Sequence, residues 1–295
     1  MFDIKALYEA QSISDAVRLL EEHPKARILA GGSDVLIKIR EGRMAGCELV
    51  SIYGLDELRG VSLDDTDALR VGPLTSFSAL EKDPLIRQYI CVLGQAAGTV
   101  GGPQVRNIGT VGGNVCNGVP SADTASTLLA WDAQLELTGP GGLRRSTVEE
   151  FYLGPGRTDV RPGELLTCIV FPRESYENYF GWYIKYSMRN AMDIATLGCS
   201  VNVKLSADGK HLEDVRAAYG VAAPTPIRAK KAEEAFRGAE ITPELPKLFA
   251  EAIQADICPR TSWRAPEDFR RHIAGELTMR ALQECIRLAG ERSAK

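Results

Sequence analysis

The residues of this sequence best placed to do chemistry are the backbone groups of two glycine-rich turns. The first turn is Ala30-Gly31-Gly32-Ser33-Asp34, directly after the apolar pair Ile28-Leu29. The second lies in GTVGGPQVRNIGTVGGN, residues 98–114, whose second GTVGG copy begins at Gly109. Because glycine lacks a Cβ and tolerates positive φ, such turns bring backbone N–H groups close to a ligand. Together they predict a site that holds both phosphates of a pyrophosphate.

The familiar phosphate-binding motifs do not account for these turns. No Gly-Lys-Ser/Thr sequence follows either of them, which excludes a P-loop. Neither has the G-x-G-x-x-G spacing, and Gly154-Pro155-Gly156 lacks a needed donor because proline has no N–H. Each turn taken alone therefore also fits a purely structural role.

Acid–base and metal chemistry have little support in the sequence. The histidines are scattered (His23, His211 and His272), and no Ser-His-Asp arrangement is visible. The 7 cysteines are odd in number and form no C-x-x-C pair, so neither a disulfide framework nor a zinc or iron–sulfur site is predicted. We therefore predict no catalytic side chain and no metal ligand.

Two charged residues have two interpretations each. Asp123 follows the second turn, and it either contributes to a site or caps the helix that comes after it. Lys185 lies among Trp182, Tyr183 and Tyr186, where it is either part of a site or a solvated or cation–π residue.

Length and charge limit the class of protein. The 295 residues indicate two or three domains, and the formal net charge of −4 argues against a nucleic-acid-binding surface. No apolar run is long enough to cross a bilayer, and the N-terminus has no apolar core of the signal-peptide type. We therefore expect a protein of the cytoplasm with reduced cysteines.

The hydrophobic pattern predicts an α+β protein in three parts, residues 1–56, 57–176 and 177–295. The first part has a helix after Ser12, strands at 27–30 and 48–52, and a short helix after the first glycine turn. The second has a helix at 124–130, a hairpin that turns at Pro140-Gly141-Gly142, and an apolar strand at 165–171. The third part has a three-stranded antiparallel sheet (181–186, 196–205, 215–221) covered by helices (229–236, 244–257, 269–289).

Several longer motifs occur together in a fixed order: AGGSDVL, RNIGTVGGNVCNGVPSADT, PGELLTCIVFP, KYSMRNAMDIATLG, GVAAPTPIR and CPRTSWRA. In order and spacing they resemble the FAD-binding medium subunits of the molybdenum hydroxylases, and most closely those of the bacterial xanthine dehydrogenases. The resemblance covers essentially the whole chain. It implies a two-part FAD-binding domain of the vanillyl-alcohol oxidase (PCMH) type, followed by a domain like the C-terminal domain of the carbon monoxide dehydrogenase flavoprotein.

The same resemblance implies where FAD would bind. One pyrophosphate segment matches Arg27, Ile28, Leu29, Ala30, Gly31, Gly32, Ser33 and Asp34, and the other matches Gly109, Thr110, Val111, Gly112, Gly113 and Asn114. Asp123 matches an aspartate that holds cofactor hydroxyls, Leu166 matches a backbone contact, and Lys185 matches a lysine that favours negative charge on the flavin. Val100 falls where some relatives carry an aromatic residue beside the flavin.

As for function, the resemblance implies one subunit of a three-part hydroxylase in purine metabolism. A large subunit would carry the molybdenum cofactor, and a small subunit would carry [2Fe–2S] clusters. This chain would receive electrons on FAD and pass them to NAD⁺, within a dimer of heterotrimers. The residues alone leave two alternatives, a free-standing NAD(P)H–flavin oxidoreductase and a flavin-binding scaffold without turnover of its own.

Overall fold

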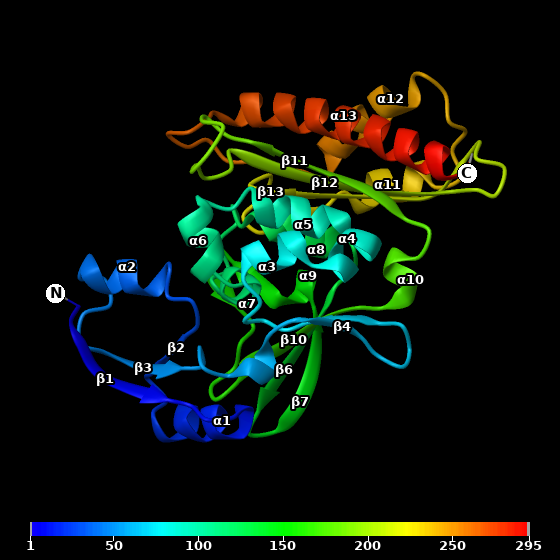
Figure 1. Cartoon of the computed structure of the whole chain (residues 1–295). Helices are drawn as coiled ribbons and strands as arrows, with labels where there is room; N and C mark the ends of the chain where they lie inside the picture. Colours follow the sequence, from blue (N-terminus) through cyan, green and yellow to red (C-terminus); the bar gives the residue numbers. More distant parts are fainter. Residues whose placement is uncertain (1, 294–295) are drawn as a thin grey trace.

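The structure, a computed structural model, describes residues 2–293, and these are organised around three larger sheets (Figure 1). The N-terminal sheet is parallel, in the order β1 (Ile4–Glu9), β3 (Cys47–Ser51), β2 (Arg27–Leu29). Helices α1 (Ile13–Glu22) and α2 (Val35–Arg40) lie on opposite sides of this sheet (Figure 1). The sequence predicts these two helices and strands β2 and β3, but it does not predict β1.

The local sequence explains where helix α1 begins and which of its faces is buried. Ser12 is its N-cap, and the Ser12 Oγ accepts a hydrogen bond from the Asp15 N–H at 3.1 Å. Its buried residues recur at helical spacing and belong to the small core around the N-terminal sheet: Ala16, Val17, Leu19 and Leu20. The cap and the apolar stripe together hold the helix against the sheet.

The middle sheet has its strands in the order β4 (Val61–Leu63), β5 (Leu69–Val71), β10 (Leu165–Phe171), β6 (Gln134–Gly139), β7 (Gly142–Thr147). All neighbours in it are antiparallel. The predicted hairpin is confirmed as β6–β7, and Gly142 at its turn has a φ of +90°, a conformation that glycine adopts without strain. Strand β10 has the predicted bounds.

A layer of helices covers one face of this sheet: α3 (Phe77–Lys82), α4 (Pro84–Tyr89), α5 (Cys91–Gly98), α6 (Pro103–Ile108), α7 (Val111–Cys116) and α8 (Asp123–Ala130). Helix α8 is buried along its whole length, because it lies between the middle sheet and the C-terminal sheet. Helix α8 matches its prediction, whereas α6 and α7 are not predicted. Short elements complete this part: η1 (Asp56–Leu58), α9 (Val148–Phe151), β8 (Tyr152–Gly154), β9 (Arg157–Thr158) and α10 (Arg173–Tyr176).

The C-terminal sheet is antiparallel, in the order β11 (Phe180–Tyr186), β12 (Leu197–Leu205), β13 (Leu212–Gly220), β14 (Ile227–Arg228). The three predicted strands are present, and the described residues add the short edge strand β14. The helices that follow are α11 (Lys230–Phe236), α12 (Leu245–Ala252), η2 (Ile253–Ala255) and α13 (Glu267–Ser293). The long helix α13 crosses the outer face of the sheet (Figure 1).

The inner face of the C-terminal sheet packs directly on the helix layer. The Asn202 side chain of β12 donates a hydrogen bond to the Ala130 carbonyl of α8 at 2.8 Å, and Asn202 is fully buried. Gly181 of β11 lies so close to this contact that a Cβ there would be 2.8 Å from the Asn202 Oδ1. The two layers therefore share a tight interface, while the division at residues 56 and 176 stays a prediction.

This interface gives a first prediction. Gly181→Ala should lower the free energy of unfolding by about 1–3 kcal/mol, because the new methyl group would also come within 2.9 Å of the Trp131 ring. Gly54→Ala is the control, since a Cβ there would have no atom within 4 Å. Urea unfolding measures both variants. Equal stability of the two would show that the C-terminal sheet does not pack on α8 as described.

Candidate cofactor-binding site

A cavity of about 1120 Å³ lies where the N-terminal sheet meets the helix layer and the middle sheet. Most of the predicted site residues line it: Arg27, Ile28, Ala30, Gly31, Gly32, Ser33, Asp34, Val100, Thr110, Gly112, Gly113, Asn114 and Leu166. The remaining predicted residues, Leu29, Gly109, Val111, Asp123 and Lys185, are not among its lining residues. A cavity of this size has room for a dinucleotide.

The two glycine turns meet at the wall of this cavity. A Cβ at Gly31 would lie 1.9 Å from the Ile108 carbonyl oxygen and 3.2 Å from the Gly109 Cα. Only glycine can occupy position 31 at this separation, because any side chain would overlap the Ile108 carbonyl. The structure thus brings together the two turns that the sequence predicts to act together.

The first turn has free hydrogen-bond donors. Gly32 has a φ of +72°, and within residues 2–293 the amides of Gly31, Gly32, Ser33 and Asp34 have no acceptor. Consecutive free amides beside a left-handed residue form a concave site that favours anions. The pyrophosphate of a dinucleotide is such an anion, so this turn fits the cofactor that the sequence predicts.

The second turn uses its amides inside the protein. The Gly112 N–H donates to the Pro73 carbonyl at 2.8 Å, and the Gly113 N–H donates to the Thr110 Oγ1 at 3.1 Å. Thr110 is therefore the N-cap of α7. The Asn114 Oδ1 accepts from Thr124 at 2.7 Å, which leaves the amide nitrogen of Asn114 as the donor at the cavity wall. Binding of a pyrophosphate by this second segment stays a prediction.

Several cationic side chains at the cavity are missed by the sequence analysis. Lys38, Arg157 and Arg161 line it together with the predicted Arg27. Neither Arg27 nor Arg157 forms an ion pair within the part of the chain that the structure describes. Lys38, in contrast, pairs with the Asp34 carboxylate at 2.5 Å and donates to the Asn117 Oδ1 at 3.0 Å. Guanidinium groups bind phosphate oxygens well, so these residues suit a pyrophosphate. The signal for Arg157 is the preceding Gly154-Pro155-Gly156 turn, where Gly156 has a φ of +70°.

Asp123 and Lys185 form a buried ion pair behind the cavity. The Lys185 Nζ lies 2.9 Å from the Asp123 Oδ2, and their side chains are only 9% and 8% exposed. Lys185 also donates to the Thr99 carbonyl at 3.0 Å, and Tyr183 donates to the Asp123 Oδ1 at 3.1 Å. Asp123 is thus not a helix cap, since Ala122 is the N-cap of α8, and Lys185 is neither solvated nor a cation–π residue. Their contact with a flavin stays a prediction.

The surroundings of this pair shift the pKa of the Asp123 carboxyl group. Burial raises the pKa of Asp123 above its ordinary value, and the attraction and hydrogen bond of Lys185 oppose that shift. Because the ammonium is compensated by a carboxylate, its effect on any ligand in the cavity is that of a dipole and not of a full positive charge.

Neither a metal site nor a membrane span is found among the described residues. Within residues 2–293, no group of three or more His, Cys, Asp and Glu side chains is arranged to hold a metal ion. None of the described helices combines the length and the apolar character needed to span a membrane.

Comparisons with known proteins identify the family of the chain. The model for the FAD binding domain in molybdopterin dehydrogenase matches residues 2–174, and the CO dehydrogenase flavoprotein C-terminal domain matches residues 182–285. The chain therefore belongs to the molybdenum hydroxylase family, as an FAD-binding medium subunit, and the free amides at Gly31–Asp34 and the size of the cavity fit that cofactor.

Individual relatives cover the whole chain. It is 38% identical over 290 residues to the xanthine dehydrogenase FAD-binding subunit of Escherichia coli O157:H7, which covers 98% of this chain and 99% of the relative. It is 29% identical to the glyceraldehyde dehydrogenase medium chain of Sulfolobus acidocaldarius, over 93% of this chain and 96% of that one. The carbon monoxide dehydrogenase structure from Hydrogenophaga pseudoflava superimposes with a TM-score of 0.90 at 29% identity, covering 97% of this chain and 98% of that chain. The predicted family and fold class are thus confirmed.

The buried ion pair gives a second prediction. Lys185→Met should lower the free energy of unfolding at neutral pH by about 3–5 kcal/mol, because it leaves the buried Asp123 carboxylate without a cationic partner. The pKa of Asp123 in the folded variant then lies above its unfolded value. As the pH falls, Asp123 therefore binds a proton at a higher pH in the folded state than in the unfolded state. The loss of stability should shrink over this pH range.

Urea unfolding at several pH values checks this, with Asp123→Asn/Lys185→Met as the rescue variant. Lys204→Met is the control, because Lys204 pairs with Glu213 in a more exposed ion pair and its loss should cost under about 1 kcal/mol. A pH-independent loss in Lys185→Met would contradict the assigned pair.

The contact between the two turns gives a third prediction. Gly31→Ala should remove most bound FAD, because the new Cβ would push the first turn away from Ile108. The measurement is the ratio of flavin to protein after desalting, with circular dichroism to monitor the fold. Gly141→Ala is the control, since no atom lies within 4 Å of a Cβ there.

A second variant covers the case in which Gly31→Ala disturbs folding. Arg157→Gln leaves the turn intact and removes a cation from the cavity wall, so it should weaken FAD binding by about tenfold. Full FAD occupancy in both variants would mean that the cofactor binds elsewhere.

Proposed function

We propose that this chain takes electrons from the [2Fe–2S] clusters of a small subunit and passes them, through FAD in the described cavity, to NAD⁺. A large subunit with the molybdenum cofactor would oxidise the substrate. The observation that carries the proposal is the open first turn, whose unpartnered amides lie against the second turn at the cavity wall.

The residues of this chain have a binding and orienting role. The amides of Gly31–Asp34, with Arg27 and Arg157, would hold the pyrophosphate, and the apolar side chains of Val100, Leu166 and Ile194 would enclose the other end of the cofactor and exclude water from it. FAD supplies a group that takes up electrons singly and gives them up in pairs. Such transfer requires alignment and not an acid–base residue, which agrees with the prediction of no catalytic side chain.

The relatives also support a proposal for the substrate and the partners. The name of the Escherichia coli relative leads us to propose a purine of the xanthine type as the substrate oxidised on the large subunit. We propose a dimer of heterotrimers in the cytoplasm as the working assembly. An interface of this kind needs a buried apolar centre with a polar rim.

A fourth prediction tests this function. The FAD-loaded chain, mixed with NADH without oxygen, should lose its flavin absorbance rapidly. Affinity purification of the tagged chain from its native source should recover a molybdenum-containing and an iron–sulfur-containing subunit. That complex should reduce NAD⁺ when it is given xanthine. If NADH bleaches the flavin but the purification recovers no partner subunit, the free-standing oxidoreductase is favoured. If NADH does not bleach the flavin, a scaffold without turnover is favoured.

A further inference from the structure

Three arginines near the C-terminal sheet lack a carboxylate partner. Arg260 and Arg264 lie in the loop before α13, and Arg270 lies in the first turns of that helix. Within residues 2–293, none of these three arginines forms an ion pair. The acid nearest in sequence to Arg264, Glu267, is engaged by Arg271 at 3.0 Å. The positive charges of the three arginines are therefore not neutralised by an ion pair, although the chain as a whole is acidic.

Arg270 is a buried cation held only by neutral acceptors. It is 2% exposed, and its guanidinium donates to the Thr196 carbonyl at 2.9 Å and to the Ser262 Oγ at 2.8 Å. Its Nε has no partner. Burial, together with Arg260 and Arg264, lowers the pKa of Arg270. An uncompensated buried charge is costly, so an anion beside this cluster would be strongly favoured.

Exposed aromatic rings lie next to the arginines. Trp263 is 77% exposed, and the Arg264 guanidinium lies over one of its faces, 4.2 Å from the ring centre. Tyr186 and Phe269 pack edge to face with ring centres 5.8 Å apart, and each is more than a third exposed. Arginine beside an open aromatic ring suits a ligand that has both phosphate and a planar base.

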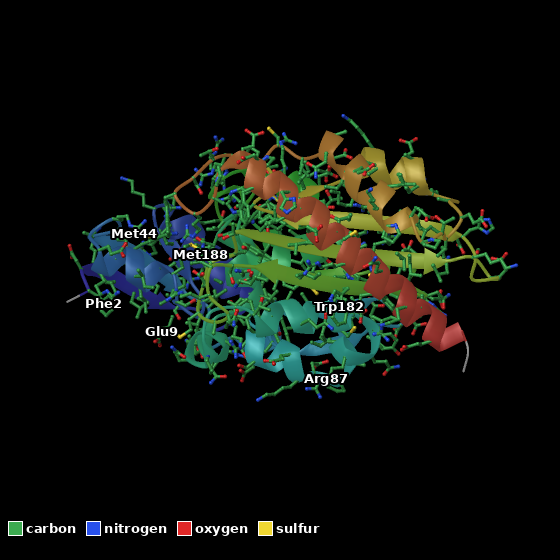
Figure 2. The ribbon with its side chains drawn as sticks, turned by 90° about the horizontal axis from the view of Figure 1, so that it is seen from above. Phe2, Glu9, Met44, Arg87, Trp182 and Met188 are labelled. Atoms are coloured by element: carbon green, nitrogen blue, oxygen red, sulfur yellow. The ribbon has the colours of Figure 1, made fainter. Side chains whose placement is uncertain are left out.

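The cluster is not part of the cavity lining, but Arg270 is connected to two lining residues by short chains of contacts. Thr196, which accepts from Arg270, ends the loop that contains Ile194, and Ile194 lines the cavity. Arg270 also donates to the Val221 carbonyl at 3.5 Å, and the Val221 N–H donates to the Pro120 carbonyl next to Val119, another lining residue. Met188 of the same loop lies on the side of the molecule where Met44 lines the cavity (Figure 2). The buried member of the cluster therefore contacts the same loop that contributes Ile194 to the cavity.

We propose that Arg260 and Arg264, backed by the buried Arg270, bind the phosphate groups of a nucleotide that approaches the cavity, with the open face of Trp263 for its base. This inference rests on the proposed function, in which the nucleotide is NAD⁺. The site is separate from the first glycine turn, so one chain would hold two phosphate-bearing ligands at once.

The test uses the full chain loaded with FAD, so that the cavity is already filled, and ADP as the probe in calorimetric titration. Arg260→Gln and Arg264→Gln should each weaken ADP binding by about tenfold, with a larger loss at high salt. In the assembled complex they should raise the KM for NAD⁺ by a similar factor with kcat unchanged. Arg87→Gln is the control, because Arg87 is an exposed arginine without an ion pair among the described residues, far from Met188 (Figure 2).

Each result of this experiment has one meaning. Unchanged ADP binding in both variants, or ADP binding only with release of FAD, would overturn the inference. Dissociation of the complex with unchanged ADP binding would assign the arginines to a carboxylate of a partner subunit and would also overturn it. Arginine-dependent ADP binding without bleaching by NADH would keep this site and refute the NAD⁺ function.

Discussion

The close approach of Gly31 to the Ile108 carbonyl is the constraint on which the cavity depends. These residues belong to different parts of the fold, and only the absence of a Cβ lets them touch. The contact leaves the first turn open, with its amides unpartnered, while the second turn uses its amides to attach α7 to Pro73 and Thr110. Two stretches that look alike in sequence thus have different physical roles, one as a source of donors and the other as the support against which it rests.

Helix α8 connects this cavity to the C-terminal sheet. It is buried on every side, so its first residue, Asp123, can keep its charge only through Lys185 of β11 and the Tyr183 hydroxyl. Asn202 fixes the other end of the helix by its bond to the Ala130 carbonyl. The sheet therefore does more than cover the helices, because it supplies the polar partners that make a fully buried helix tolerable.

The sequence was informative where local signals were strong. Strand β10, the β6–β7 hairpin and the β2–turn–α2 unit follow from apolar runs and glycine turns that need no distant partner. Helix α7 could not be predicted, because its two glycines disfavour a helix and tertiary bonds to Pro73 and Thr75 hold it. The Lys185–Asp123 pair could not be derived from local pattern, since it joins β11 to α8 across the fold. Only the family resemblance assigned both residues to a cofactor site.

The cavity also links ligand binding to the stability of the whole chain. Its walls come from the N-terminal sheet and from the helix layer, and the small apolar core of the N-terminal part also includes Leu74 and Leu165 of the middle part. A molecule that touches both turns acts as a reversible cross-link between these parts. By mass action it stabilises the native state by about 2.7 kcal/mol at a hundred times its Kd. The supply of cofactor in the cell would thereby add to the packing that holds the N-terminal sheet in place, and it would raise the resistance of the chain to proteolysis.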